Sequence, residues 1–528
     1  MSVQADPVFA LTSCGAQGNT LSEIYDGLVE GDLVETLDPL NVLLPLLTSK
    51  DEAAWKILQI IADKCNAREI ILAAAESLEN LHRSSLNESD IEEEGEELAL
   101  PDQTLRLMNL YCAVVPRVPI RKKGPASIVQ GFVAELSSVV SNLSDGISGE
   151  DGRRILASGH ELSTSISCWA KAKEGISIEE IKSLHDILCN FIESLVDSLA
   201  HCINASLAMR SFIEVFPRLG SLHASENDDR WKEGTVIISN MNASYIEMRG
   251  GDYRTRPPQI SKASFILFAY WQFATRDQPM SNPPSYLSHF LPVLLSSIQT
   301  NTIIDETLSF LLLSLRQASH LSPEIIIPLS TMLPPFCSAH PDPSIRHYAF
   351  RAFSLLLDRT EPPLRMQILQ DLTSDKEAPQ MRVAAVGLVK DSLIAALGST
   401  SNVLASPMFL KTFGNILFTP DPPSFFSEPK TKMTEEEQNE LVRLTECLGL
   451  LYVLMVRDVG NKTGIRDKDN LANVERTLLK PMSDAIPTWI EQAAAADDGH
   501  PDSIIPLMSI QLNLERVYEV LDRLKGPL

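Results

Sequence analysis

The chain has 528 residues, of which 44% are hydrophobic and 6% aromatic, a composition typical of folded proteins and not of disordered ones. One hydrophobic core rarely serves more than about 300 residues, so a chain of this length must form several domains or a repeat array. The 69 acidic and 45 basic residues give a formal net charge of −24. Such a charge repels nucleic-acid phosphates and anionic membranes and attracts basic partners.

No targeting or membrane segment is evident in the sequence. The first ten residues contain Asp6 and lack a basic region followed by a long apolar run, so no signal peptide is expected. The longest apolar stretches, 265–273 and 448–456, are shorter than the roughly 18–20 residues that cross a bilayer. The eight cysteines are sparse and irregularly spaced, which argues against a disulfide framework. We therefore expect either a cytoplasmic protein or one that is shared between the cytoplasm and the nucleus.

Leucine dominates the apolar residues, and the alternation typical of strands is rare, so the fold is predicted to be all-α. In 53–63, for example, Ala54, Ile57, Leu58 and Ile61 recur at spacings of three and four and share one helix face. Two tracts of the S/T-x-x-E form, 177–180 and 434–437, predict capping boxes at helix starts.

Breaks in the helical pattern divide the chain into seven predicted segments. They are N-terminal helical repeats (1–82), an acidic disordered loop (83–100), helical repeats (101–220), an irregular loop (221–258), HEAT-like repeats (259–418), a proline-rich linker (419–433) and C-terminal helical repeats (434–528).

Two charged tracts are candidates for partner contacts. The acidic loop carries seven acidic residues from Glu88 to Glu97 and is either a contact for a basic partner or a solubilising insertion. The basic tract consists of Arg117, Arg121, Lys122 and Lys123. It is either a solvated turn between helices or a binding site, and the ligand of such a site would be an acidic peptide or a nuclear import receptor.

The region 285–397 contains a repeated unit. Three helix pairs are predicted there, at 286–298 with 304–315, 323–333 with 343–357, and 363–372 with 379–397. Pro292 and Pro328 are 328 − 292 = 36 residues apart, and Arg346 and Arg382 are 382 − 346 = 36 residues apart. A period of this size built from helix pairs is typical of helical solenoids.

A short motif in this region resembles the second helix of HEAT repeats. It comprises Asp342, Arg346 and Ala349, with Arg382 and Ala385 at equivalent positions in the next unit. The resemblance implies that the aspartate and arginine link adjacent repeats and that the alanine admits a close helix. The predicted fold class is therefore an all-α, HEAT/armadillo-like superhelix of degenerate repeats.

The sequence offers little for catalysis. Motifs for phosphate loops, dinucleotide binding, zinc proteases and hydrolase nucleophiles are lacking, so we expect neither an enzyme nor a cofactor. Cys337 and His340 have the spacing of two metal ligands, but no second pair follows at a suitable distance, so no metal is expected. Cys14 lies among small residues, where a thiol is accessible, and is the candidate redox residue. No partner-binding residue can be assigned.

Several tracts together resemble the family that joins glomulin, the plant aberrant-lateral-root-formation protein and the fungal YAP-binding proteins. They are 281–287 (SNPPSYL), 290–292 (FLP), 415–420 (NILFTP), 456–458 (VRD) and 461–465 (NKTGI).

This resemblance implies HEAT-like repeats and a protein-binding regulator. For the fungal branch it implies an adaptor that binds an AP-1-like bZIP transcription factor in the oxidative stress response, and a paralogous branch is linked to kinetochores. For the animal branch it implies an inhibitor whose last repeats, about 435–525 here, cover the RING subunit of cullin ubiquitin ligases. We favour the fungal adaptor and keep the ligase inhibitor and a kinetochore-associated scaffold as alternatives.

Overall fold

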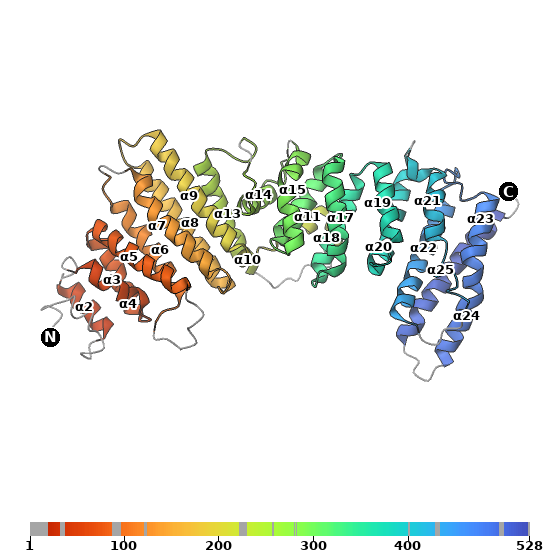
Figure 1. The fold of residues 1–528 in the computed structure, drawn as a ribbon, viewed down its shortest axis with the longest axis horizontal. Helices are drawn as coiled ribbons and strands as arrows, with labels where there is room; N and C mark the ends of the chain where they lie inside the picture. The colour runs from red at the N-terminus through yellow and green to blue at the C-terminus, as the bar shows by residue number, and fades with distance from the viewer. Residues whose placement is uncertain are drawn as a thin grey trace. The chain divides into compact units, whose positions relative to one another are not determined.

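The computed structural model describes residues 20–31, 37–86, 97–120, 124–220, 230–255, 258–278, 280, 282–399, 402–427, 433–495 and 501–525. Within these ranges the chain is almost entirely helical, and strand-like pairing is limited to one isolated bridge between Ser49 and Glu97. The predicted all-α, helical-repeat class is therefore confirmed (Figure 1). No helix in the described ranges is long and apolar enough to cross a membrane. The chain forms two compact units, Met1–Ser281 with Thr300–Leu313, and Asn282–Gln299 with Ser314–Leu528.

The first unit is a stack of helices in two layers. Helices α2, α4, α6 and α8 pack in succession in one layer, and α3, α5, α7 and α9 pack in succession in the other. Each hairpin covers the apolar face of its neighbour, as in solenoids. The helices are α2 (Leu21–Gly31), α3 (Pro39–Thr48), α4 (Glu52–Lys64), α5 (Ala67–Leu86), α6 (Leu100–Val114), η3 (Val115–Arg117), α7 (Pro125–Leu143), α8 (Gly149–Lys171), α9 (Ile178–Ser198), α10 (Ala200–Ile203), α11 (Leu207–Val215), α12 (Pro217–Gly220), α13 (Arg230–Arg249) and α14 (Lys262–Ala274).

The second unit contains the helices predicted from the 36-residue period, together with the C-terminal repeats. Helix α17 packs on α18, α19 on α20, α20 on α22, and α22 on α25. The helices are α15 (Pro283–Thr300), α17 (Pro323–Ala339), α18 (Pro343–Asp358), α19 (Pro362–Ser374), α20 (Pro379–Leu397), η4 (Val403–Ala405), α21 (Met408–Leu417), α22 (Glu435–Arg457), α23 (Lys468–Val474), η5 (Glu475–Leu479), α24 (Lys480–Ala495) and α25 (Pro501–Lys525). The predicted partner of α15, α16 (Ile304–Gln317), begins in the first unit.

Both predicted capping boxes are formed. The Ser177 hydroxyl accepts a hydrogen bond from the Glu180 amide, and the Glu180 carboxylate accepts one from the Ser177 amide. Thr434 and Glu437 do the same at the start of α22. Each box satisfies amide groups that a helix start leaves unpaired, which explains why both helices begin at these residues.

Three segment predictions need correction. The range 221–258 was expected to be irregular, but it contains the 20-residue helix α13. Gly234, Asn240 and Asn242 make this a weak helix former, and packing on α8 and α9 stabilises the helix. Both ends of the range 83–100, which was predicted to be a loop, are helical, because α5 extends to Leu86 and α6 starts at Leu100. In the proline-rich range, which was predicted to be a linker, Phe425 is buried and its ring contacts that of Trp489, so this residue anchors the segment to α24.

A buried acidic pair anchors α16 in the first unit. The Asp305 carboxylate accepts hydrogen bonds from the amides of Leu207 (2.5 Å) and Ala208 (2.8 Å), so it caps the start of α11. The neighbouring Glu306 is 4% exposed and accepts a hydrogen bond from the Tyr270 hydroxyl at 3.2 Å. Burial, together with the charge of Asp305, raises the pKa of Glu306 to about 8.

This raised pKa predicts a pH dependence of stability. The folded state disfavours the ionised form of Glu306. The contribution of protonated Glu306 to the free energy of unfolding is therefore fully present below the ordinary glutamate pKa of 4.5, and it is lost as the pH rises toward about 8. The Glu306→Gln variant should therefore lose less stability than the wild type between pH 5 and 8. Urea denaturation at several pH values measures this difference. Equal slopes in the two proteins would contradict the prediction.

Because α13 is closely packed, we predict that replacing Gly234 with a larger residue destabilises the protein. A Cβ atom there would overlap the carbonyl oxygen of Ile203, so Gly234→Ala should destabilise the protein by about 1–3 kcal/mol. In α7, the matched control Gly131→Ala meets open space and should stabilise its helix by up to about 1 kcal/mol. Thermal unfolding of both variants by circular dichroism tests the contrast, and a neutral Gly234→Ala would refute it.

Candidate functional site

The first copy of the repeat motif closes its own hairpin. Asp342 is the N-cap of α18 and accepts a hydrogen bond from the Ser344 amide at 2.7 Å. Arg346 donates to the carbonyls of His340 (2.7 Å) and Pro341 (3.1 Å), at the end of α17. These contacts differ from the expected link between adjacent repeats. The buried Ala349 lies in α18, which packs directly on α17.

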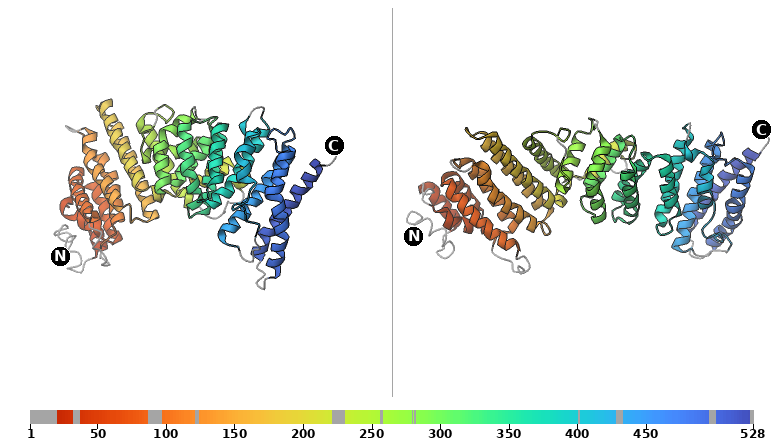
Figure 2. Two further views of the ribbon diagram at one scale, coloured as in Figure 1. Left: turned by 45° about the vertical axis from the view of Figure 1, so that its right-hand side comes forward. Right: turned by 45° about the horizontal axis from the view of Figure 1, so that its top comes forward.

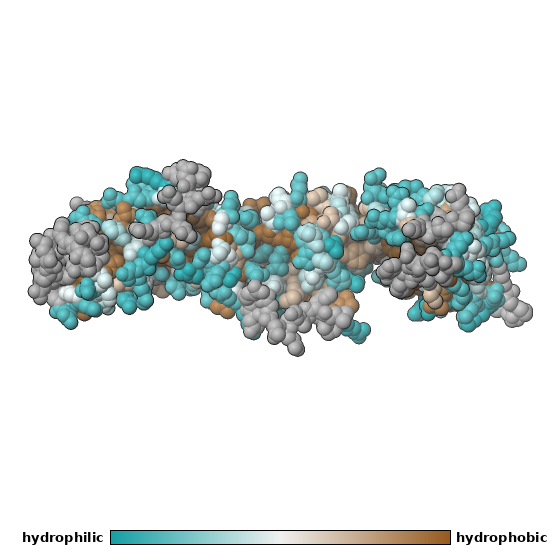
Figure 3. Space-filling model, turned by 90° about the horizontal axis from the view of Figure 1, so that it is seen from below, coloured by the Kyte–Doolittle hydropathy of each residue, from teal (hydrophilic) through white to brown (hydrophobic). Residues whose placement is uncertain are grey.

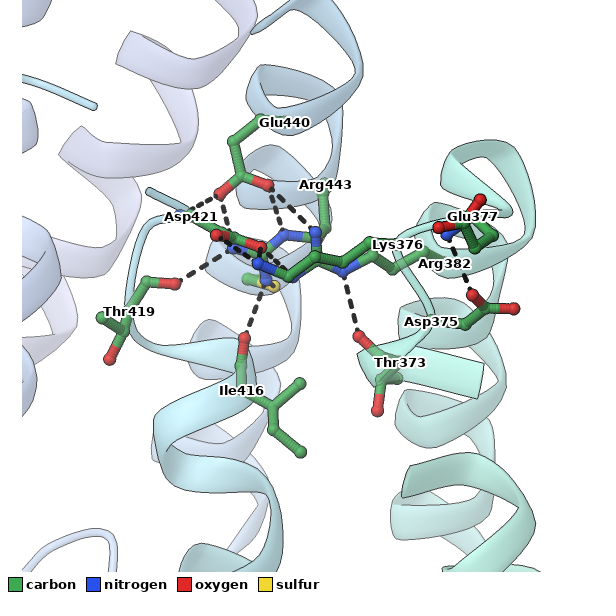
Figure 4. A network of polar contacts seen from close by, with 11 residues as sticks. Thr373, Asp375, Lys376, Glu377, Arg382, Ile416, Thr419, Asp421, Glu440 and Arg443 are labelled. Carbon is green, nitrogen blue, oxygen red and sulfur yellow. Dashed lines mark hydrogen bonds and ion pairs between the residues drawn. The ribbon is translucent and has the colours of Figure 1, made fainter. Parts of the chain in front are cut away.

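The second copy does reach the following repeat. Arg382 in α20 donates to the carbonyl of Thr373 at the end of α19, at 3.1 Å, and pairs with Asp421 at 3.1 Å and Glu440 at 3.8 Å. Asp421 lies in the loop after α21, and Glu440 lies in α22 (Figure 4). Ala385, one turn further along α20, is fully buried. Arg382 thus joins α19, α20 and α22.

Glu440 and Arg443 form the centre of this network. The guanidinium of Arg443 donates twice to the Glu440 carboxylate, at 2.6 and 2.7 Å, and both side chains are almost completely buried. It also donates to the carbonyls of Ile416 (2.9 Å) and Thr419 (3.1 Å), at the end of α21 (Figure 4). A buried ion pair is tolerated only when such additional hydrogen bonds satisfy its remaining donors.

The charges of the network shift the pKa values of its members. Burial by itself would raise the pKa of Asp421, but the adjacent Lys376 and Arg382 outweigh it and hold that pKa below the usual range. Burial would likewise lower the pKa of Arg443, but the hydrogen bonds and charge of Glu440 raise it. Burial raises the pKa of the neighbouring Cys447 thiol to about 11, so this thiol stays protonated at neutral pH.

A second family tract, 456–465, forms an ordered loop at the end of α22. The buried Asp458 carboxylate accepts hydrogen bonds from the amides of Lys462 and Thr463, both at 2.8 Å. The Lys462 ammonium group donates to the carbonyls of Leu397 and Ser399, at the end of α20. The loop therefore ties the end of α22 to the end of α20.

The sequence reasoning missed Glu440, Arg443 and Asp421. A signal was present, because Glu440 and Arg443 are spaced three apart and fall among the apolar positions Leu441, Leu444 and Cys447 of one helix face. Charged residues on an apolar face indicate a buried ion pair. The third member, Asp421, comes from a loop 19 residues away from Glu440, and no local pattern identifies it.

The opposite face of α22 carries exposed apolar residues, which we call the α22 strip. Val442, Tyr452 and Val456 are 44%, 39% and 40% exposed, and the half-buried Gly449 lies between them. Positions 442, 449 and 456 are seven apart and so share one side of the helix. A Cβ at Gly449 would meet nothing within 4 Å, so no contact inside the described ranges requires a glycine there.

The neighbouring helices α20 and α25 also carry exposed apolar residues. Ion pairs Arg382–Glu440 and Lys390–Glu446 (3.4 Å) occur in the same order along α20 and α22, so the two helices run parallel. Lys390 borders the exposed face of α20, which carries Ile394 at 44% exposure. Helix α25 packs on α22, and Figures 1 and 2 show the three helices side by side. The exposed apolar residues of α25 are Ile505 (60%), Met508 (58%) and Leu512 (50%).

Apolar exposure of this kind is uneven over the molecule. On the face drawn in Figure 3, hydrophobic side chains gather in patches between hydrophilic ones. Positions 505, 508 and 512 on α25 recur at spacings of three and four, and positions 442, 449 and 456 on α22 recur at a spacing of seven, so each set lies on one side of its helix. Apolar patches that are rimmed by polar residues are typical of protein-binding surfaces.

The remaining candidates from the sequence have structural roles or lie outside the described ranges. Arg117 donates to the carbonyls of Ala62 and Cys65 and so caps the end of α4. Cys337 is buried in α17, and His340 ends that helix. Among the described residues, no three His, Cys, Asp or Glu side chains gather as metal ligands would. Outside the described residues lie Cys14, Arg121, Lys122, Lys123 and the acidic tract 87–96.

The buried pair predicts a large effect of removing one partner. Arg443→Leu removes both short hydrogen bonds from the guanidinium to the buried Glu440 carboxylate, leaves it the longer 3.8 Å ion pair with Arg382, and should cost about 3–5 kcal/mol of unfolding free energy. Replacing both residues, as Glu440→Gln with Arg443→Met, should cost less because no charge is stranded. The exposed pair Arg523–Glu519 supplies the control, since Arg523→Leu should change stability by less than about 1 kcal/mol. Urea unfolding of these variants tests the ranking, and equal effects of Arg443→Leu and Arg523→Leu would contradict it.

Comparison with known proteins agrees with this architecture. The family described as the uncharacterised protein family YAP/Alf4/glomulin matches residues 258–517, about half of the chain. All the tracts that carry the resemblance in the sequence lie inside this range. No curated protein matches the chain. The family is one of non-catalytic helical-repeat proteins that act through protein–protein interaction. From the match over residues 258–517, the chain belongs to the YAP/Alf4/glomulin family.

Proposed function

We propose that this chain is a non-enzymatic adaptor that binds an AP-1-like bZIP transcription factor in the oxidative stress response. We propose that the adaptor acts in the cytoplasm and can enter the nucleus. The observation that carries the proposal is the set of exposed apolar residues on α20, α22 and α25, which no described segment of the chain covers. Family membership supports a protein as the ligand of this surface.

The shape of the surface suits a helical partner. The seven-residue spacing of Val442, Gly449 and Val456 matches the repeat with which a helix presents one apolar side. Gly449 has open space above it and admits the close approach of a partner backbone. A bZIP protein is a long helix with a strongly basic region, and the net charge of −24 would accelerate its association.

The same surface also supports the alternative of a cullin–RING ligase inhibitor. Six of these exposed apolar residues, all except Ile394, fall between 442 and 512, inside the range expected to cover a RING subunit. A kinetochore-associated scaffold would use such a surface too. These readings differ in the partner that is bound, so the partner must be identified.

Affinity purification of the tagged full-length chain from its own cells, with and without peroxide, tests the proposal. A bZIP factor should be enriched after peroxide treatment. Val456→Glu places a charge in the α22 strip and should reduce its recovery at least tenfold, because burying an unpaired carboxylate is costly. Ile178→Glu, on a residue that is 86% exposed at the start of α9, introduces the same charge elsewhere and should leave recovery unchanged.

Recovery of RING and cullin subunits in both conditions, lost in Val456→Glu, would replace the adaptor with the ligase inhibitor. Recovery of kinetochore proteins on the same terms would favour the scaffold. Equal recovery by Val456→Glu and Ile178→Glu would show that the α22 strip does not bind the partner.

A further inference from the structure

A groove of about 480 Å³ lies between α4 and α6 in the first unit. Its floor is apolar and buried, formed by Leu58, Ala62 and Leu110. Its walls are different, because the side chains that rise from the two helices are polar or aromatic and partly exposed. These are Trp55, Gln59 and Asp63 from α4, and Asn109 from α6, with the small Ala113 beside it.

The wall residues form two facing ridges. Trp55, Gln59 and Asp63 are spaced by four and line up along α4, and Asn109 and Ala113 are spaced by four along α6. Trp55, Gln59, Asp63 and Asn109 make no side-chain hydrogen bond or ion pair with another described residue. Their polar groups thus remain available to a ligand that lies along the groove.

Each wall group suits one part of a basic peptide in an extended conformation. The face of an indole ring attracts a guanidinium or ammonium group, and the Asp63 carboxylate supplies the opposite charge. The side-chain amides of Gln59 and Asn109 each offer donors and an acceptor, which match the amides and carbonyls of an extended main chain. Ala113 leaves room on the opposite wall.

The nearby cations do not make this an anion site. Arg106 donates to the carbonyls of Leu46 (2.9 Å) and Ser49 (2.7 Å) at the end of α3. Arg117 donates to the carbonyls of Ala62 and Cys65 at the end of α4. The negative end of a helix dipole offsets each of these charges. Asp63 is the ionisable side chain that lines the groove.

From this arrangement we infer that the α4–α6 groove binds an extended, arginine- or lysine-containing peptide segment of a partner protein. This site lies in the first unit and shares no residue with the α22 strip. It therefore adds a second, chemically distinct contact to the proposed adaptor, and it can be tested without knowing the partner of the strip.

The probe is a fluorescein-labelled, twelve-residue peptide in which arginine alternates with serine and glycine. Matched peptides carry glutamine or glutamate in place of arginine. Fluorescence anisotropy with the full-length chain should show binding of the arginine peptide, weakening as salt is added. Trp55→Ala and Asp63→Asn should each weaken this binding about tenfold. Asp145→Asn, at an exposed position in the turn after α7, removes the same charge outside the groove and should stay within about twofold.

Several results would overturn the inference. Equal weakening by Asp63→Asn and Asp145→Asn would mean that only the overall charge attracts the peptide. Tighter binding of the glutamate peptide would assign an anionic ligand to the groove. If Trp55→Ala fails to fold, Asp63→Asn and Asn109→Ala carry the test, since both change partly exposed side chains. Val456→Glu should retain peptide binding, so failure of the α22 strip and failure of the groove are distinguishable.

Discussion

Every helix hairpin in this chain has an apolar face that only another hairpin can cover, and the whole architecture depends on this constraint. An isolated pair such as α8–α9 would expose the residues that α6, α7 and α13 bury. Stacking solves the problem locally, because each pair needs only its neighbours. The same constraint explains why the weak helix α13 forms at all. Its own residues favour helix poorly, and contact with α8 and α9 stabilises it.

Polar anchors in the stack restrict how the hairpins can meet. An apolar face tolerates small rotations, whereas the Glu440–Arg443 pair and its carbonyl acceptors require one arrangement of α21 and α22. Arg382 and Lys462 extend this control to α20. In the first unit, Asp305 of α16 caps the start of α11 and so fixes the position of these two helices relative to each other. A misplaced repeat would leave these groups buried without partners, which is costly. Such anchors give a degenerate repeat a definite geometry.

The two proposed contact regions differ in the chemistry of the side chains that their helices expose. Helices α20, α22 and α25 carry exposed apolar residues that suit a helical partner, whereas α4 and α6 line a groove with polar and aromatic side chains that suits an extended basic segment. Each unit presents its own contact region, because recognition needs only side chains that the stacked helices of that unit hold at fixed spacing. Two weak contacts on one chain bind a partner more tightly than either alone when both are engaged together.

The sequence by itself determined the helical class, the 36-residue period and the family, because helix periodicity, caps and prolines are local signals that every repeat carries. It also placed the helix pairs between 286 and 397 near their observed bounds, except that α17 continues to Ala339, six residues beyond the predicted end at 333. Only the tertiary structure decided that Arg346 closes its own hairpin while Arg382 reaches α22, although both have the same motif. It likewise decided that Arg117 caps α4 and that Trp55 and Asn109 face each other across a groove. Contacts between residues dozens of positions apart depend on how hairpins stack, and the local sequence at either end does not contain that information.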